Sequence, residues 1–147
     1  MTQKQPFIIS TGQMNLRGVN VLDITVKSSG DGLGTILAPT WELVGGHKRH
    51  THPDDERWQQ YEPLTDEQYS DAYLALLRQR YKTNREAFHQ IIEQGMVTLV
   101  CYCAAEGFCH RHLAKAVLVK IAENIGYEVA DTGEIEQLEL NGQFKLL

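Results

Sequence analysis

Short apolar runs alternate with segments of helical periodicity along most of the chain. Strands are predicted at 7–11, 19–26, 96–101 and 127–130, of which 19–26 is richest in β-branched residues. Residues 96–101 are apolar at almost every position, which is typical of a strand covered on both faces in a parallel sheet. We therefore predict that this strand lies inside a mainly parallel sheet.

The first helix is predicted to begin at Pro39, because proline suits the first turn of a helix. Two consecutive glycines, Gly45 and Gly46, are predicted to end it. The stretch from 47 to 63 has no apolar period and is interpreted as a long surface loop.

Two later helices are predicted from capping-box spacings, in which Thr65 is followed by Gln68 and Thr83 by Glu86. A further helix is predicted over 109–124, directly after the apolar strand. Glycines predicted to end the last two of these helices stand at 95 and 126.

Strands and helices that alternate in this way predict a single α/β domain over residues 1–147, in three layers around a mainly parallel sheet. At the C-terminal end, Asn141–Gly142 separates two short apolar segments, 138–140 and 144–146. An Asn-Gly pair in this position favours a two-residue β-hairpin. We therefore expect a C-terminal β-hairpin appended to the domain.

The charge and hydropathy of the chain argue against two classes of binding partner, nucleic acids and membranes. The chain has 14 Lys and Arg against 19 Asp and Glu, a net charge of −5, which repels nucleic-acid backbones and argues against non-specific nucleic-acid binding. No apolar run reaches the roughly 18 residues that a membrane span requires, and the first residues do not resemble a secretory signal. We expect no membrane association and a cytoplasmic location.

The candidate chemistry is concentrated where the apolar strand passes into the last helix. All three cysteines, Cys101, Cys103 and Cys109, lie within nine residues. Parallel sheets bind ligands at the carboxyl ends of their strands, and a thiol at a helix N-terminus is more easily ionised. We predict a catalytic set of Cys101, Cys109, His110 and Arg111, in which His110 transfers protons and Arg111 clamps an anion.

Two other interpretations of these residues remain open. Cys103, Cys109 and His112 could bind zinc, because positions 109 and 112 share one face of a helix, although the spacing matches no common zinc motif. Alternatively, the cysteines are small buried apolar residues and Arg111 forms a structural ion pair. The cofactor is therefore left unassigned, with zinc as the candidate.

Residues elsewhere in the chain are candidates for binding the substrate. His47 and Lys48 open a stretch with three of the six histidines, which could bind a metal or line an anion site, or be a solvated loop. Asp23 either faces the same pocket or caps a turn, and Lys27 follows it closely. Trp41 either stacks on a ligand ring or packs in the core.

The sequence resembles domain-of-unknown-function family 488. The family has a strand ending in Leu-Leu-Cys-x-Glu, a short turn, and then Cys-His-Arg and a helix with Leu-Ala. Leu99–Cys101 and Cys109–Ala114 resemble these two blocks at the same separation. Ile8–Gly12 and Leu22–Val26 are similar to its N-terminal strands.

A subset of that family is more similar still, with matches at Leu37–Trp41, Gly46–Lys48 and Cys101–His112. Cys103 departs from the broader family, which has Glu there, and Thr25–Lys27 replaces an Arg-rich segment. The resemblance implies a parallel α/β domain with a site at the cysteine-bearing strand end, but no established reaction.

These observations favour a small enzyme with a Cys/His/Arg anion-binding site that acts on a phosphate-bearing small molecule or nucleotide. The alternative is a module that binds zinc or a partner without catalysis.

Overall fold

The computed structural model describes residues 5–16, 18, 20–102 and 108–135. Four strands form one sheet in the order β2-β3-β1-β4, and every neighbouring pair is parallel. Their bounds are β1 Phe7–Gln13, β2 Val21–Asp23, β3 Met96–Cys101 and β4 Val129–Glu134. The α/β class and the parallel sheet are thus confirmed. The predicted strand 19–26 is reduced to three residues.

Parallel pairing brings the carboxyl ends of all four strands to one edge of the sheet. Gln13 lies opposite Cys101, Asp23 opposite Val100, and Glu134 opposite Thr11. Residues that follow different strands therefore meet at this edge, which is where open parallel sheets bind ligands.

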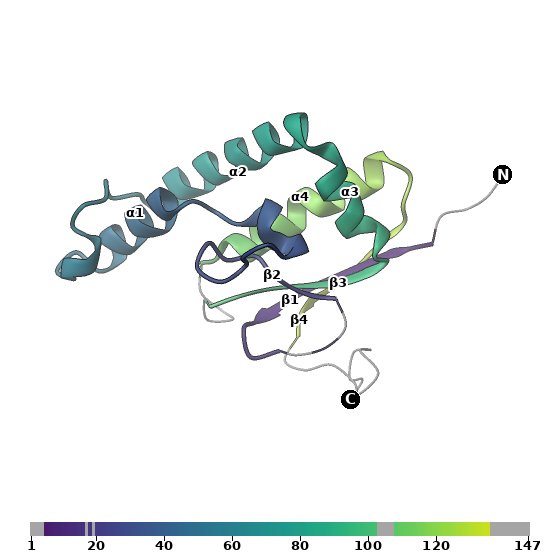
Figure 1. The fold of residues 1–147 in the computed structure, drawn as a ribbon, viewed down its shortest axis with the longest axis horizontal. Helices are drawn as coiled ribbons and strands as arrows, with labels where there is room; N and C mark the ends of the chain where they lie inside the picture. Colours follow the sequence, from purple (N-terminus) through teal and green to yellow (C-terminus); the bar gives the residue numbers. More distant parts are fainter. Residues whose placement is uncertain (1–4, 17, 19, 103–107, 136–147) are drawn as a thin grey trace.

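The helices lie on one side of the sheet (Figure 1). They are α1 Trp41–Thr51, α2 Asp66–Thr83, α3 Arg85–Glu93 and α4 His110–Asn124, with short 3₁₀ turns η1 Leu33–Leu37 and η2 Glu56–Trp58. The crossovers β2 to β3 and β3 to β4 run in the same direction across the sheet, so right-handed connections place their helices on the same face. The described residues thus form two layers, whereas the sequence predicts three.

Buried apolar side chains fill the space between the helices and the sheet. The core joins β1 and β3, through Ile9 and Leu99, to α2, α3 and α4, through Leu77, Phe88 and Leu118. This packing fixes where the strand β3 ends and where α4 begins.

The predicted end of α1 at Gly45 and Gly46 is wrong. The helix continues to Thr51, so the first part of the predicted loop 47–63 is helical. A Cβ atom at Gly45 would collide with the ring of Tyr61, and one at Gly46 would lie 2.5 Å from the Glu62 carbonyl oxygen. The two glycines therefore let the returning segment lie against the helix, and they do not end it.

Of the two predicted capping boxes, one is confirmed. Thr65 accepts a hydrogen bond from the Gln68 amide, and the Gln68 side chain accepts one from the Thr65 amide. Thr83 instead lies inside α2, where its hydroxyl donates to carbonyl oxygens of Gln79 and Arg80. Asn84 is the residue before α3, and its side chain makes no capping hydrogen bond.

The glycines predicted to follow α3 and α4 have positive φ angles, +85° at Gly95 and +99° at Gly126, as helix-ending glycines do. The predicted C-terminal hairpin lies outside the described residues. Within the described residues, every helix is too short or too polar to cross a membrane.

Candidate functional site

A pocket of about 530 Å³ opens at the carboxyl edge of the sheet, within the range of small-molecule sites. Its buried wall includes Thr25 after β2, Cys101 at the end of β3, Cys109 and His110 at the start of α4, and Tyr69 from α2. Three of the four predicted catalytic residues therefore line one pocket.

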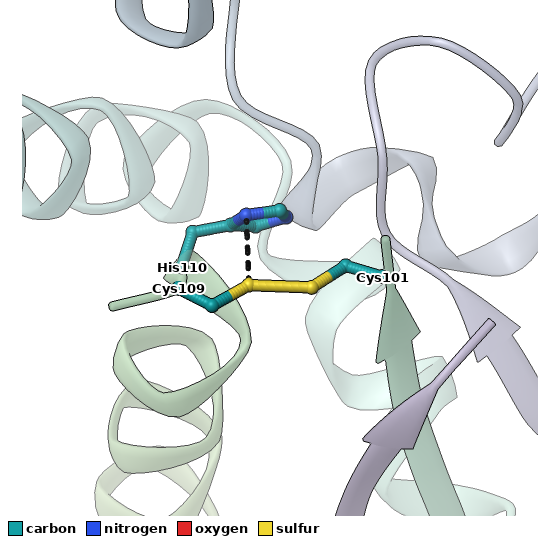
Figure 2. Close-up of side chains that lie close together, drawn as sticks. All are labelled: Cys101, Cys109 and His110. Carbon is teal, nitrogen blue, oxygen red and sulfur yellow. Dashed lines mark hydrogen bonds between the residues drawn. A yellow bond between two sulfur atoms is a disulfide. The ribbon is translucent and has the colours of Figure 1, made fainter. Parts of the chain in front are cut away.

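Cys101 and Cys109 are joined by a disulfide (Figure 2). Cys101 is the last residue of β3, and Cys109 is the N-cap of α4, eight residues later, so the bond ties the strand end to the helix start. Both residues are almost fully buried, with 1% and 4% exposure, although both line the pocket. The sequence predicts reactive or metal-binding thiols here but not this bond.

His110 is held in one tautomer by the backbone. Its Nε2 lies 2.7 Å from the carbonyl oxygen of Ile24, which can only accept, so Nε2 carries the proton. Nδ1 is then the unprotonated atom of the neutral ring, and it lies 3.8 Å from Cys109 Sγ (Figure 2). Once the disulfide is reduced, the Cys109 thiol faces a proton acceptor.

The surroundings of His110 keep its ring neutral. The pKa of His110 is lowered to about 4, mainly by burial and also by the nearby Arg111 charge, while the hydrogen bond to the Ile24 carbonyl opposes the shift. The Tyr73 ring packs edge-on against the imidazole at 5.5 Å between centroids. At neutral pH the ring is therefore unprotonated, and Nδ1 can accept a hydrogen bond from the Cys109 thiol.

Arg111 lies beneath the pocket and does not line it. The side chain is fully buried, and Nε and Nη2 donate to the two carboxylate oxygens of Glu134 at 3.1 and 3.0 Å. Nη1 donates to Cys101 Sγ at 3.0 Å. This bidentate contact is the structural ion pair that the sequence left open as an alternative to an anion clamp.

Glu134 completes this buried group from the end of β4. Burial raises its pKa, but hydrogen bonds from Arg111 and Thr11 outweigh burial, and the net shift is downward. Thr11 Oγ1 donates to the carboxylate at 2.6 Å. Sequence reasoning missed Glu134, because the predicted strand ended at residue 130.

The mouth of the pocket is basic and aromatic. No aspartate or glutamate occurs among its described lining residues. The groups that can carry positive charge are Lys27, His47, Lys48, His52 and Arg57, and the aromatic ones are Trp41, Trp58, Tyr69, Tyr102 and Phe108. This lining contrasts with the net charge of −5 of the whole chain.

Four of the five predicted substrate-binding residues line this pocket: Lys27, Trp41, His47 and Lys48. Trp41 is 42% exposed, so it is available to a ligand. Asp23 is not part of the lining. Its Oδ1 accepts from the Thr25 amide at 2.9 Å and from the Thr25 hydroxyl at 2.7 Å, so it caps the turn after β2.

His47 has a defined place in the wall of the pocket. Its Nε2 lies 2.6 Å from Asp66 Oδ1, and its ring contacts Tyr69 and Phe108. Arg49, from the same stretch, points elsewhere, since Nη1 donates to the carbonyl oxygens of Gln59 and Tyr61. It fixes the segment that returns along α1.

Three further lining residues come from the stretch 47–63, which the sequence analysis interpreted as a long surface loop: His52, Arg57 and Trp58. Arg57 is paired with Asp55 at 2.7 Å, and its guanidinium lies 5.4 Å from the centre of the Trp58 ring. The cluster of basic residues at 47–52 and the adjacent pair Arg57–Trp58 were the available signal for a ligand-binding role.

The predicted zinc set of Cys103, Cys109 and His112 lies only in part within the described residues. Cys103 lies outside them, and His112 is half-buried next to Lys115 and Glu134 rather than in the pocket. A different set, Cys101, Cys109 and His110, has donor atoms within 4.8 Å of one another. In the reduced state these three could hold a metal ion.

Comparison with known families extends the assignment. A family model described as "DUF488-N3a: Active DUF488-N3 subclade" matches residues 24–122, more than half of the chain. The chain belongs to the DUF488-N3a family. Its match covers the wall and mouth of the pocket, from Thr25 to His110, as well as Arg111.

The DUF488-N3a match confirms the family resemblance seen in the sequence. Neither a curated protein nor a solved structure matches the chain. Glu134, which binds Arg111, lies beyond the matched residues of the DUF488-N3a model.

Proposed function

We propose that this DUF488-N3a protein is a small enzyme that acts on a phosphate-bearing small molecule or nucleotide. The observation that carries the proposal is the composition of the pocket. A buried cysteine with an adjacent proton acceptor stands in its wall, while its mouth has basic and aromatic residues and no described carboxylate.

In the reduced protein, Cys109 is the proposed nucleophile and His110 its base. The proton passes from Sγ to Nδ1, and the thiolate attacks an electrophilic atom of the substrate. The Ile24 carbonyl acts as the third group that orients the base. His110 can then return the proton to the leaving group.

Lys27, Lys48 and Arg57 are proposed to bind the anion, in place of the buried Arg111. They come from three separate segments and line the same pocket, and Arg57 is also paired with Asp55, which does not line it. Electrostatic attraction is strengthened in a cleft lined by one sign of charge. Trp41 and Trp58 present aromatic faces beside these cations, which favours a ligand with a ring, such as a nucleotide base.

Two further observations support this function. The description of the matching subclade as active is consistent with catalysis. We also propose a cytoplasmic location, since thiols remain reduced there and a disulfide in that compartment is typically transient or catalytic rather than structural.

Intrinsic fluorescence provides a direct test, because both tryptophans of the chain line the pocket. Reduced protein is titrated with AMP, with inorganic phosphate and with uncharged adenosine. We expect a saturable change with AMP, weaker binding of phosphate, and the weakest binding of adenosine.

Lys48→Glu should weaken AMP binding about tenfold or more, because it places a carboxylate at the mouth of the pocket. Lys120→Glu, on an exposed position of α4, makes the same change in net charge away from the pocket and should leave binding unchanged. Equal effects of the two variants, or no response to any anion, would refute the proposal.

A metal-binding function is the second candidate, supported by the three donor atoms of Cys101, Cys109 and His110. The hydrogen bond from His110 to the Ile24 carbonyl is the kind of contact that orients metal-bound histidines. Elemental analysis of protein kept reduced and free of chelators tests it. About one zinc ion per chain, lost in Cys109→Ser, would favour this candidate.

A further inference from the structure

We infer that Cys101 and Cys109 form a redox-active disulfide that exchanges with an anionic low-molecular-weight thiol, one that carries a carboxylate or phosphate. This activity uses the same pocket but does not depend on a phosphate-bearing substrate. It rests on three features. The pocket gives access to the two buried sulfurs, the two sulfurs have different hydrogen-bonding neighbours, and the residues that line the pocket include several cations.

Among the described residues, the two sulfurs are reached from the pocket. Cys101 and Cys109 are nearly buried, yet both belong to the pocket lining. A partner that exchanges with them must therefore be small enough to enter a volume of about 530 Å³. A protein thiol on a folded domain does not meet this requirement, whereas a small soluble thiol does.

The two sulfurs differ in their neighbours. Cys101 Sγ accepts a hydrogen bond from the Arg111 guanidinium at 3.0 Å, whereas Cys109 Sγ lies beside the neutral His110 ring at 3.8 Å. The helix N-terminus also favours a thiolate at Cys109, but a direct hydrogen bond from a cation is the stronger effect. Cys101 is therefore the better leaving group.

Exchange is then directed to Cys109. A thiolate RS⁻ attacks Cys109 Sγ, the bond between the two sulfurs breaks, and its electron pair leaves on Cys101 as a thiolate held by Arg111. A second RS⁻ attacks the sulfur that R contributed, which frees Cys109 and forms RSSR. Two electrons pass to the protein, and two RSH are oxidised to one RSSR.

The route favours a negatively charged thiol. Lys27, Lys48 and Arg57 line it, no carboxylate occurs among the described lining residues, and Arg57 is paired with Asp55 outside the lining. Focused positive potential raises the local concentration of an anion and the rate of its encounter. The same potential repels a cationic thiol.

Three probes of similar size distinguish charge from general reactivity: 3-mercaptopropionate, 2-mercaptoethanol and cysteamine. Their rates of reducing the oxidised protein are measured by quenched mass spectrometry and divided by their rates toward a neutral small disulfide. We expect the normalised rate of the anionic thiol to exceed that of the cationic thiol by about tenfold or more. Equal normalised rates would overturn the inference.

Lys48→Glu should reduce the difference between the normalised rates of the anionic and the cationic thiol. Lys120→Glu should leave that difference unchanged, because only Lys48 lines the pocket. A chain whose three cysteines stay free after treatment with a small disulfide would overturn the inference outright. AMP binding by the reduced protein is recorded separately, so failure of the proposed function is distinguished from failure of the exchange.

Variants in a Cys103→Ser background test which sulfur is attacked. Treated with 3,3′-dithiodipropionate, Cys101→Ser should accumulate a stable mixed disulfide at Cys109, since no second thiol remains to displace it. Cys109→Ser should not retain a comparable adduct at Cys101, because the thiolate held by Arg111 is the better leaving group. A more stable adduct at Cys101 than at Cys109 would contradict the direction of exchange.

Discussion

His110 shows how a single buried imidazole links the site to stability. Its pKa is lowered to about 4 in the folded protein, mainly by burial, against an ordinary value of 6.5. Between these values the unfolded chain binds a proton that the folded protein does not. The free energy of unfolding is therefore fully present above pH 6.5 and falls as the pH decreases toward 4.

From the difference between those two pKa values, we expect His110 to account for roughly 3 kcal/mol of this loss of stability. Urea unfolding of the wild type and of His110→Gln between pH 4 and 7 measures it. The slope of stability against pH should be clearly smaller in the variant, and parallel slopes would show that His110 is not responsible.

Arg111 and Glu134 give a second prediction at this scale. Glu134→Ala leaves a buried guanidinium without its carboxylate and should lower the free energy of unfolding by about 2 kcal/mol, a value reduced because Glu134 is partly exposed. Asp131→Ala, which removes the more exposed ion pair with Lys115, is the matched control and should cost less than about 1 kcal/mol. Similar losses in both variants would contradict the role assigned to the buried pair.

Whether a contact in the site can be predicted from the sequence depends on how far apart its two residues lie along the chain. Cys109 and His110 are adjacent, so their proximity follows directly from the sequence. The contact from Arg111 to Glu134 spans 23 residues and requires the register that places Glu134 opposite Thr11. No local pattern encodes that register, and the anion role predicted for Arg111 came from its residue type alone.

At the scale of elements, Thr65 and Thr83 stand in similar sequence motifs but are predicted to contribute differently to stability. Thr65→Ala removes a capping hydrogen bond and should cost about 1 kcal/mol. Thr83→Ala should change stability by less than about 0.5 kcal/mol, since its hydroxyl bonds back within α2. Chemical denaturation of both variants checks this contrast, which equal losses would refute.

Gly45 gives the second prediction for elements. Alanine is favoured over glycine by about 1 kcal/mol within helices. Gly45→Ala should nevertheless destabilise the protein by about 1–3 kcal/mol, because its Cβ collides with the Tyr61 ring. Glu42→Ala, at an exposed position of the same helix, should have little effect. A more stable Gly45→Ala protein would show that Tyr61 does not pack as described.

Local signals thus predicted the elements unevenly. The apolar run of β3 and the capping box at Thr65 are confirmed, whereas the same spacing at Thr83 falls inside α2. The glycine pair of α1 has two physical meanings, because glycine can end a helix or admit a close neighbour. Only contact with Tyr61 and Glu62 distinguishes them, and that contact is tertiary.

At the scale of the whole molecule, the places where charged residues gather say more about possible ligands than the net charge does. A net charge of −5 argues against broad affinity for nucleic acids but does not reveal a pocket lined by Lys27, Lys48 and Arg57. These residues come from three segments that the fold gathers at one edge of the sheet. The strand-to-helix motif predicted the wall of the pocket, and Lys27, Trp41, His47 and Lys48 of its mouth were also candidates from the sequence. The place of Arg57 in the mouth required the path of the chain from α1 to α2 (Figure 1).

The most direct test of the central claim is the rate at which reduced protein is alkylated at Cys109. Iodoacetate and iodoacetamide are compared at neutral pH, with the modified cysteine located by mass spectrometry and a free small thiol as the reference. We predict that Cys109 reacts fastest of the three cysteines, that iodoacetate is favoured relative to the reference thiol, and that AMP slows the reaction. Equal, slow alkylation of all three cysteines, without preference for the anionic reagent, would contradict an anion-binding pocket with a reactive thiol.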